Sequence, residues 1–225
     1  MKTLRISCQI GMIWTAVLFA ACSSLCADTP VTAEKYRGFT IDDSLVQNMA
    51  NLEAVRTAIK EQIDIVCVVG VSTQTLAFFQ TVPLKIVPMG TIARGSPGLY
   101  AQKDKSVKIV SGITGVGHKP VLLHEYLHAY HDQRMEGRFR NPVVLDYYQH
   151  ARTLNAFAAN SHMMDNAQEF FACSATTYLF GVTAQEPFQR DKIKDKQPDV
   201  FEYLKKLFGP DAGSYAGSLT RKDEK

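Results

Sequence analysis

The sequence predicts an α+β domain in which a small N-terminal mixed β-sheet packs on a helical C-terminal part. Short segments rich in β-branched residues lie before residue 112, whereas longer segments with apolar residues at helical spacing dominate after it. Strands followed by helices indicate an α+β fold rather than a regular alternation of the two. Roughly 200 residues remain once an N-terminal leader is removed, which suits one domain with a sizeable core.

The leader is residues 1–27, which have the composition of an export signal peptide. Lys2 and Arg5 form a short basic start, and a mostly apolar run at 10–21 is followed by small residues. This run is too short for a comfortable membrane span, which needs about 20 apolar residues. We therefore expect an exported protein, either periplasmic or secreted.

Two processing sites fit this leader. Cleavage after Ala27 would leave residues 28–225 as a single domain with a polar C-terminal tail. The sequence FAAC at 19–22 instead resembles a bacterial lipoprotein box, which would place a lipid on Cys22. In that case the lipid would anchor the protein to a bacterial membrane.

Charge and cysteine content limit the partners and sites of the domain. The formal charge of +3 falls to about +1 when Lys2 and Arg5 leave with the leader, so the surface gives no case for nucleic acid or an anionic membrane. Outside the leader only Cys67 and Cys173 remain, and both have apolar neighbours. A disulfide and two buried free thiols both stay open, and neither spacing suits a cysteine metal site.

The first part of the domain carries the predicted strands. Residues 28–45 are mixed and polar and predict a strap across the surface. Apolar residues at helical spacing predict a helix at 44–63, and IDIVCVVG at 63–70 fits either a strand or the continuation of that helix. A strand is expected around 82–87. A hairpin follows, with a turn at 96–98, strands at 99–102 and 106–111, and then a glycine-rich connector at 112–117.

Proline and glycine mark the first two helices of the second part. Pro120 is expected as the first residue of a helix that runs to about Arg134 and stops by Gly137. The proline of RFRNP begins the next predicted helix, which covers VVLDYYQHARTLNAF and reaches residue 157.

Two further helices are predicted nearer the C-terminus. Asp165 fits an N-cap, with the return glutamine of a capping box at Gln168, and opens the helix EFFACSATTYLF that Gly181 closes. A charged stretch at 188–196 leads to a short terminal helix at 198–208, bounded by proline and glycine.

One motif carries chemistry: residues 124–128, HEYLH, match H-E-x-x-H. Positions i and i+4 share one face of a helix, so His124 and His128 can reach one tetrahedral metal ion. Glu125 lies about 100° further round the helix, where it can act as a general base on water. Leucine and tyrosine surround these polar groups, whose burial is unfavourable without a partner such as a metal. We therefore predict a Zn²⁺ site.

A catalytic zinc ion usually has three protein ligands, so a third must come from elsewhere in the chain. Glu169 is the strongest candidate, because it is a lone carboxylate near the start of an otherwise apolar helix. His131 follows His128 by one turn, but three ligands along one helix would splay along its axis. We expect His131 to face solvent or to support a ligand. Weaker candidates are Glu136, Asp146 and His150.

HEYLHAYHD followed about forty residues later by N-x-x-E-F-F-A resembles the catalytic domain of the anthrax lethal factor-like zinc metallopeptidases. The resemblance covers roughly residues 70–209, including SPGLY, PVVLDYY and QPDVFEYLKKLFG. It implies a zincin-like metallopeptidase fold. It also implies that His124, His128 and Glu169 bind zinc and that Glu125 is the general base.

The resemblance breaks at one position. Lethal factor-like enzymes have a tyrosine seven residues before the ligand glutamate, where it donates a hydrogen bond to the oxyanion, whereas this chain has His162 there. A histidine can donate from the same place, and loss of one such donor typically slows catalysis by about 10²–10³-fold. His162 is therefore the candidate oxyanion donor, and an ordinary loop histidine is the alternative.

Together these observations predict an exported zinc metalloendopeptidase that hydrolyses a peptide or protein substrate. The strands predicted at 99–102 and 106–111 are both candidates to hold an extended substrate by edge pairing. The main alternative is an exported zinc-binding protein with weak or no catalysis that acts as a binding module. A non-peptidase hydrolase, and a metal-free domain whose stability a chelator would not change, also stay open.

Overall fold

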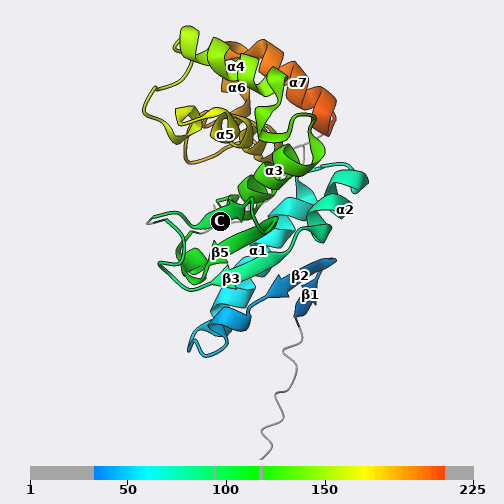
Figure 1. Ribbon diagram of the computed structural model, residues 1–225, viewed down its shortest axis with the longest axis vertical. Coiled ribbons are helices and arrows are strands. Elements are labelled where there is room, and N and C mark those ends of the chain that lie inside the picture. The colour runs from blue at the N-terminus through cyan, green and yellow to red at the C-terminus, as the bar shows by residue number, and fades with distance from the viewer. Residues whose placement is uncertain (1–32, 94, 117–118, 211–225) are drawn as a thin grey trace, which may run out of the picture. The chain divides into compact units, whose positions relative to one another are not determined.

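The computed structural model describes residues 33–93, 95–116 and 119–210, and Figure 1 shows how their helices and strands are arranged. They form an α+β fold with a small mixed sheet toward the N-terminal end, which confirms the predicted class. The strands are β1 (Glu34–Tyr36), β2 (Phe39–Asp42), β3 (Leu84–Val87), β4 (Gly98–Ala101) and β5 (Ser106–Val110). The α-helices are α1 (Leu52–Val68), α2 (Thr73–Thr81), α3 (Val121–Arg134), α4 (Pro142–Thr153), α5 (Ala167–Phe180), α6 (Arg190–Lys196) and α7 (Pro198–Phe208). Short 3₁₀ helices are η1 (Ser44–Val46), η2 (Ser111–Gly115), η3 (Arg138–Arg140) and η4 (His162–Met164).

The described strands form one sheet in the order β1-β2-β3-β5-β4. The outer pairs β1–β2 and β4–β5 are antiparallel, while β2, β3 and β5 run parallel to one another. Side chains alternate between the two faces: Ile86 and Ile109 are fully buried, whereas Lys85 and Lys108 are partly exposed. One face of the sheet therefore covers the core, and β4 is an edge strand among the described strands.

Helix α1 packs against α3 and fixes the point at which α3 begins. The side chain of Gln62 donates from Nε2 to the carbonyl of Lys119 (2.8 Å) and accepts the N–H of Leu122 at Oε1 (3.1 Å). The N-cap of α3 is Pro120, whose side chain offers no hydrogen-bond acceptor for the first free N–H groups of the helix. Gln62 supplies that acceptor instead. The prediction of Pro120 as the first helical residue is thus wrong by one position.

Helix α3 lies in the middle of the fold, between the sheet and the helices α4–α7 (Figure 1). On the sheet side, the fully buried ring of Tyr126 lies 5.5 Å from Phe39 and 5.2 Å from Phe79, measured between ring centroids. On the other side α3 packs against α5, in which every residue from Phe170 to Phe180 is buried. Apolar burial therefore holds α3 and α5 next to each other.

Several N-terminal predictions are wrong. The described part of the expected strap, residues 33–45, contains β1 and β2, which are too short to reveal a strand period in the sequence. The helix expected at 44–63 begins at Leu52 and runs to Val68. For most of IDIVCVVG the helical alternative is therefore confirmed and the strand alternative is wrong. Burial of Ile63, Ile65 and Val66 outweighs their weak helix propensity. Helix α2 was not predicted.

The hairpin and the later helices agree better with the sequence. Strand β3 and the β4–β5 hairpin are confirmed, and α3 ends at Arg134. Helix α4 begins at Pro142 but ends at Thr153, before the predicted residue 157. The charged stretch contains the unpredicted helix α6. Gly181 and Gly209 are the C-caps of α5 and α7, as expected.

The N-cap of α5 is Asn166 rather than Asp165. Its Oδ1 accepts hydrogen bonds from the N–H groups of Gln168 and Glu169, both at 2.9 Å. An N-cap side chain bonds the second and third helical residues in this way. Helix α5 therefore begins at Ala167, and Glu169 is its third residue.

The predicted leader, including Cys22 and both processing sites, and the tail from residue 211 lie outside the described residues. Within those residues no helix is both long and apolar enough to cross a membrane. Cys67 is partly exposed, Cys173 is buried, and both are free thiols, so the alternative of a disulfide between them is wrong.

Candidate metal centre

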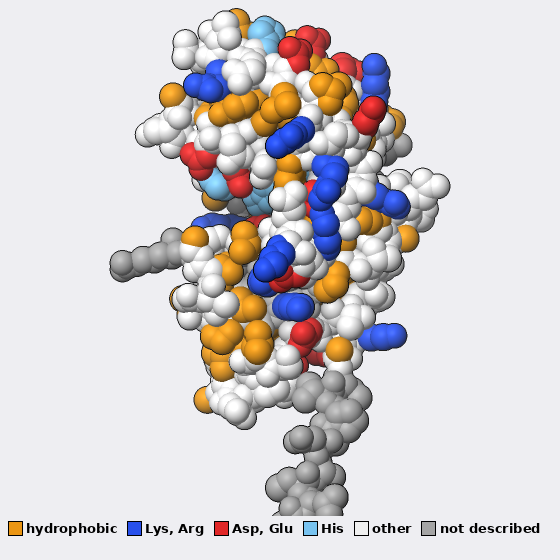
Figure 2. Space-filling model, viewed as in Figure 1, with side chains coloured by type: hydrophobic (Ala, Val, Ile, Leu, Met, Phe, Trp, Pro, Cys, Tyr) orange, Lys and Arg blue, Asp and Glu red, His pale blue; other side chains and the backbone are white. Residues whose placement is uncertain are grey.

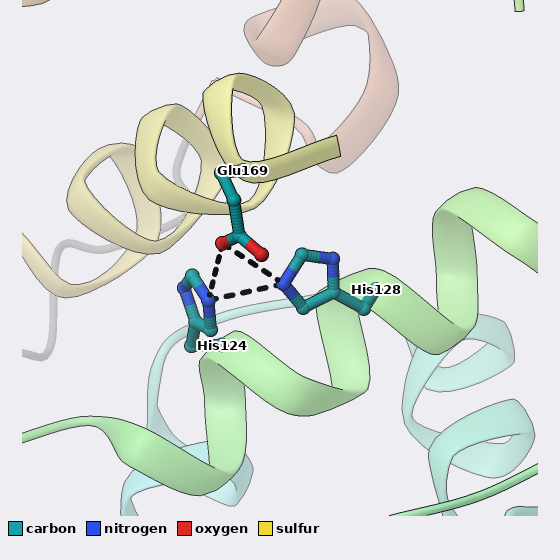
Figure 3. A group of neighbouring side chains, drawn as sticks. All are labelled: His124, His128 and Glu169. Carbon is teal, nitrogen blue, oxygen red and sulfur yellow. Dashed lines mark hydrogen bonds and ion pairs between the residues drawn. The ribbon is translucent and has the colours of Figure 1, made fainter. Parts of the chain in front are cut away.

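Helix α3 presents His124 and His128 on one face, as the four-residue spacing requires. Figure 3 shows both rings pointing from α3 toward α5, with Glu169 reaching down from α5 between them. The two Nε2 atoms are 3.1 Å apart. Both side chains are largely buried, so neither ring is freely solvated.

Glu169 completes a group of three possible ligands. Its Oε2 lies 3.2 Å from Nε2 of both His124 and His128, and the three ligand atoms all lie within 4.8 Å of one another. Donors about 2.0–2.1 Å from one tetrahedral ion lie roughly 3.3–3.4 Å apart. The observed separations of 3.1–3.2 Å are close to that value. Two imidazoles and one carboxylate also form a donor set that catalytic zinc sites use, so the residues fit the ion.

The charge of Glu169 depends on these neighbours. Burial acts to raise the pKa of its carboxyl group, but the hydrogen bonds from His124 and His128 outweigh burial and lower the pKa. Glu169 is therefore a carboxylate at neutral pH, the form that binds a metal.

Glu125 is buried beside this group and is tied to the edge strand. Its Oε2 accepts a 2.7 Å hydrogen bond from the backbone N–H of Tyr100 in β4. Burial raises the pKa of Glu125 to about 7, although the nearby His124 and the Tyr100 N–H act in the opposite direction. At Gly98 an added Cβ would lie 2.8 Å from Glu125 Cγ and 2.9 Å from its Oε1. The glycine thus leaves room for the glutamate.

His162 also lies at this group, on η4. Its Nε2 is 3.0 Å from Glu169 Oε2, and its Nδ1 is 2.8 Å from Asp165 Oδ2. His162 does not belong to the group of three residues whose ligand atoms could hold one ion. The structure therefore places the sequence-predicted residues Glu125 and His162 around the three possible ligands.

A pocket of about 460 Å³ opens over these residues. It is lined by His124, Glu125 and His162, by residues 95–97 before β4, and by residues 183–185 after α5. Figure 2 shows histidine and acidic side chains gathered at a recess on this face of the molecule. The group can thus be reached from solvent.

The weaker ligand candidates do not join the group. Glu136, Asp146 and His150 are exposed and lie outside the group. His131 is fully buried, so the expectation that it faces solvent is wrong. The ring of His131 lies 5.2 Å from that of Phe139 and 4.7 Å from that of Phe171. Burial there lowers the pKa of His131 to about 4.

The sequence did not predict a second buried charged group on α3, the carboxylate of Asp132. Burial acts to raise the pKa of the Asp132 carboxyl, but its hydrogen bonds lower it to about 2. The donors are Tyr100 Oη (2.8 Å), Gln102 Nε2 (3.0 Å), Lys105 Nζ and Arg138 Nη2 (2.8 Å). This Asp132 cluster joins α3 to the edge strand and to η3. The available signal was an aspartate four residues after His128 on an otherwise buried helix.

No protein-family model matches the chain, and no curated protein matches it. Among solved structures, the Pro-Pro endopeptidase PPEP-2 from Paenibacillus alvei matches with a TM-score of 0.44 and 17% sequence identity. The match covers 69% of this chain and 92% of that chain. What this protein does is therefore inferred from its own side chains.

Proposed function

We propose that this protein is an exported, zincin-like zinc metallopeptidase that hydrolyses peptide bonds with an activated water. The observation that carries the proposal is the approach of His124 Nε2, His128 Nε2 and Glu169 Oε2 to within 4.8 Å of one another. Glu125, the neighbour of His124, lines the same pocket. Three such donors beside a buried carboxyl group form the set that metal-assisted hydrolysis needs.

In this proposal His124, His128 and Glu169 hold the ion and Glu125 moves the proton. A bound Zn²⁺ supplies Lewis-acid chemistry, which polarises the scissile carbonyl and lowers the pKa of water. Glu125 takes a proton from the attacking water and delivers it to the leaving amine nitrogen as the C–N bond breaks. Burial raises the pKa of Glu125 to about 7, which suits a group that first accepts and then donates a proton.

The substrate is a peptide or protein in this proposal, and its main chain pairs with the edge strand. Strand β4 ends the described sheet and directly follows the pocket-lining residues 95–97. Strand β5 is not available for this role, because β3 and β4 flank it on both sides. His162, which lines the pocket, donates to the oxyanion during turnover.

The second candidate is an exported zinc-binding protein with weak or no catalysis. The observation that favours it is His162 itself, because its Nε2 contacts Glu169 rather than pointing freely into the pocket. In this alternative the ion joins α3 to α5 and the pocket binds a partner without cleaving it.

Zinc content and cleavage of an unfolded protein such as casein, measured on the same samples, test the proposal. Wild type should hold one zinc per chain and cleave casein until a chelator is added. Glu169→Ala should lose or weaken zinc binding, whereas Glu125→Gln should keep zinc and lose cleavage. The exposed Glu136→Ala is the matched control and should behave as wild type.

The outcomes separate the candidates. Zinc without cleavage in the wild type would favour the binding protein. A wild type that takes up no zinc after reconstitution would rule out both zinc-dependent functions.

A further inference from the structure

His162 links two carboxylates, one of which is a candidate metal ligand. Its Nε2 lies 3.0 Å from Glu169 Oε2 and its Nδ1 lies 2.8 Å from Asp165 Oδ2. Ionised carboxylates only accept hydrogen bonds, and each nitrogen of the His162 ring faces one of the two. A hydrogen bond to an ionised carboxylate is stronger than one between two neutral groups. The chain Asp165–His162–Glu169 therefore fixes the direction of the Glu169 carboxylate.

The turn that carries His162 is itself held in place by the core. In η4, Met163 and Met164 are buried, and the hydroxyl of Tyr148 in α4 donates to the carbonyl of Met164 (3.0 Å). Asp165 follows η4 directly and Asn166 caps α5. The turn and the start of α5 form one short connected segment, so local structure places His162 next to Glu169.

We propose that His162, oriented by Asp165, is a positioning residue that holds Glu169 for metal binding in the substrate-free protein. This inference rests on the metal site of the proposed function. Groups that hydrogen-bond to metal ligands orient them, and their loss typically weakens metal affinity by about 10–100-fold. The role differs from that of an oxyanion donor, which affects turnover without changing metal affinity.

Zinc affinity is the direct measurement, made by competition with a chromophoric chelator and without any substrate. His162→Ala should raise the Kd for Zn²⁺ by about 10–100-fold. His162→Gln should recover part of that loss, because its amide N–H can still donate to Glu169. Asp165→Ala should weaken zinc binding on its own. In the His162→Ala background it should have no further effect, because it acts through the ring. His150→Ala, an exposed histidine on α4, is the control and should match wild type.

The thermal unfolding midpoint of each zinc-free variant shows whether that variant folds. If His162→Ala does not fold, the zinc affinity of His162→Gln tests the inference instead. A Kd unchanged in both His162 variants would overturn the inference and leave the metal site standing. A Co²⁺-substituted wild type whose spectrum and X-ray absorption require a third imidazole would overturn it as well, because His162 would then be a ligand. A wild type that binds no zinc would overturn the inference together with the proposed function.

Discussion

The backbone N–H of Tyr100 donates a 2.7 Å hydrogen bond to the side chain of Glu125. The same tyrosine donates from its hydroxyl to Asp132 Oδ2 at 2.8 Å, almost two turns further along α3. One residue of the edge strand thus holds α3 at two points, and the first of these is the proposed general base. Two hydrogen bonds of Tyr100 therefore hold strand β4 against the helix that carries His124 and His128.

Gly98 sets the space available to Glu125. Because an added Cβ would lie 2.8 Å from Glu125 Cγ, Gly98→Ala should push the carboxyl group out of place and reduce casein cleavage by roughly 10²-fold. Zinc content should stay at the wild-type level, since the three ligands are not touched. Gly115→Ala is the control, because nothing lies within 4 Å of its added Cβ. Full activity of Gly98→Ala would argue against Glu125 as the base.

Zinc should stabilise the fold, because its ligands come from both α3 and α5. A ligand at a hundredfold excess over its Kd stabilises the native state by about 2.7 kcal/mol. For a domain of this size that is roughly 5–10 °C in Tm, measured by thermal unfolding with and without a chelator. Glu169→Ala should lose most of this shift. An equal shift in both proteins would place the ion elsewhere.

His131 should make the protein sensitive to mild acid. The pKa of His131 in the folded protein is about 4, below the usual value of about 6.5. Between these two pH values the unfolded chain binds a proton at His131 and the folded chain does not. Stability is therefore complete above about pH 6.5 and is lost as the pH falls toward 4, by roughly 3 kcal/mol. His131→Phe should remove this loss and fit beside Phe139 and Phe171.

Urea unfolding of zinc-free protein between pH 4 and 7 measures the difference. His150→Phe, at an exposed position, should keep the wild-type pH dependence. Identical pH profiles for wild type and His131→Phe would contradict the prediction.

Asp132 should affect stability at lower pH than His131. The folded pKa of Asp132 is about 2, below its ordinary value of about 4. The stability that its carboxylate contributes is therefore complete above about pH 4 and is lost as the pH falls through 2. Asp132→Asn breaks a buried ion cluster and should lower the free energy of unfolding at pH 7 by about 3 kcal/mol. The gap from wild type should narrow below pH 3. Asp104→Asn, which removes an exposed ion pair with Lys108, should change stability little.

The sequence predicted the parts of the fold that local rules control. Proline marked the starts of α4 and α7, glycine marked the ends of α5 and α7, and the β4–β5 hairpin followed from its turns. Strands β1 and β2 were not predicted, because three or four residues show no period. Helix α2 was also not predicted. IDIVCVVG became helix because burial of its β-branched side chains outweighed their propensity.

By itself, the sequence determined which side chains could form the candidate site. His124, Glu125 and His128 followed from helix geometry, and Glu169 from the unfavourable burial of a lone carboxylate. Only the tertiary structure decided how these residues meet. Packing of α3 on α5 brings Glu169 to His124 across 45 positions of chain, and β4 brings Tyr100 to Glu125 across 25. Such contacts depend on how whole elements pack, so no local spacing encodes them. For the same reason the burial of His131 and the Asp132 cluster emerged only from the fold.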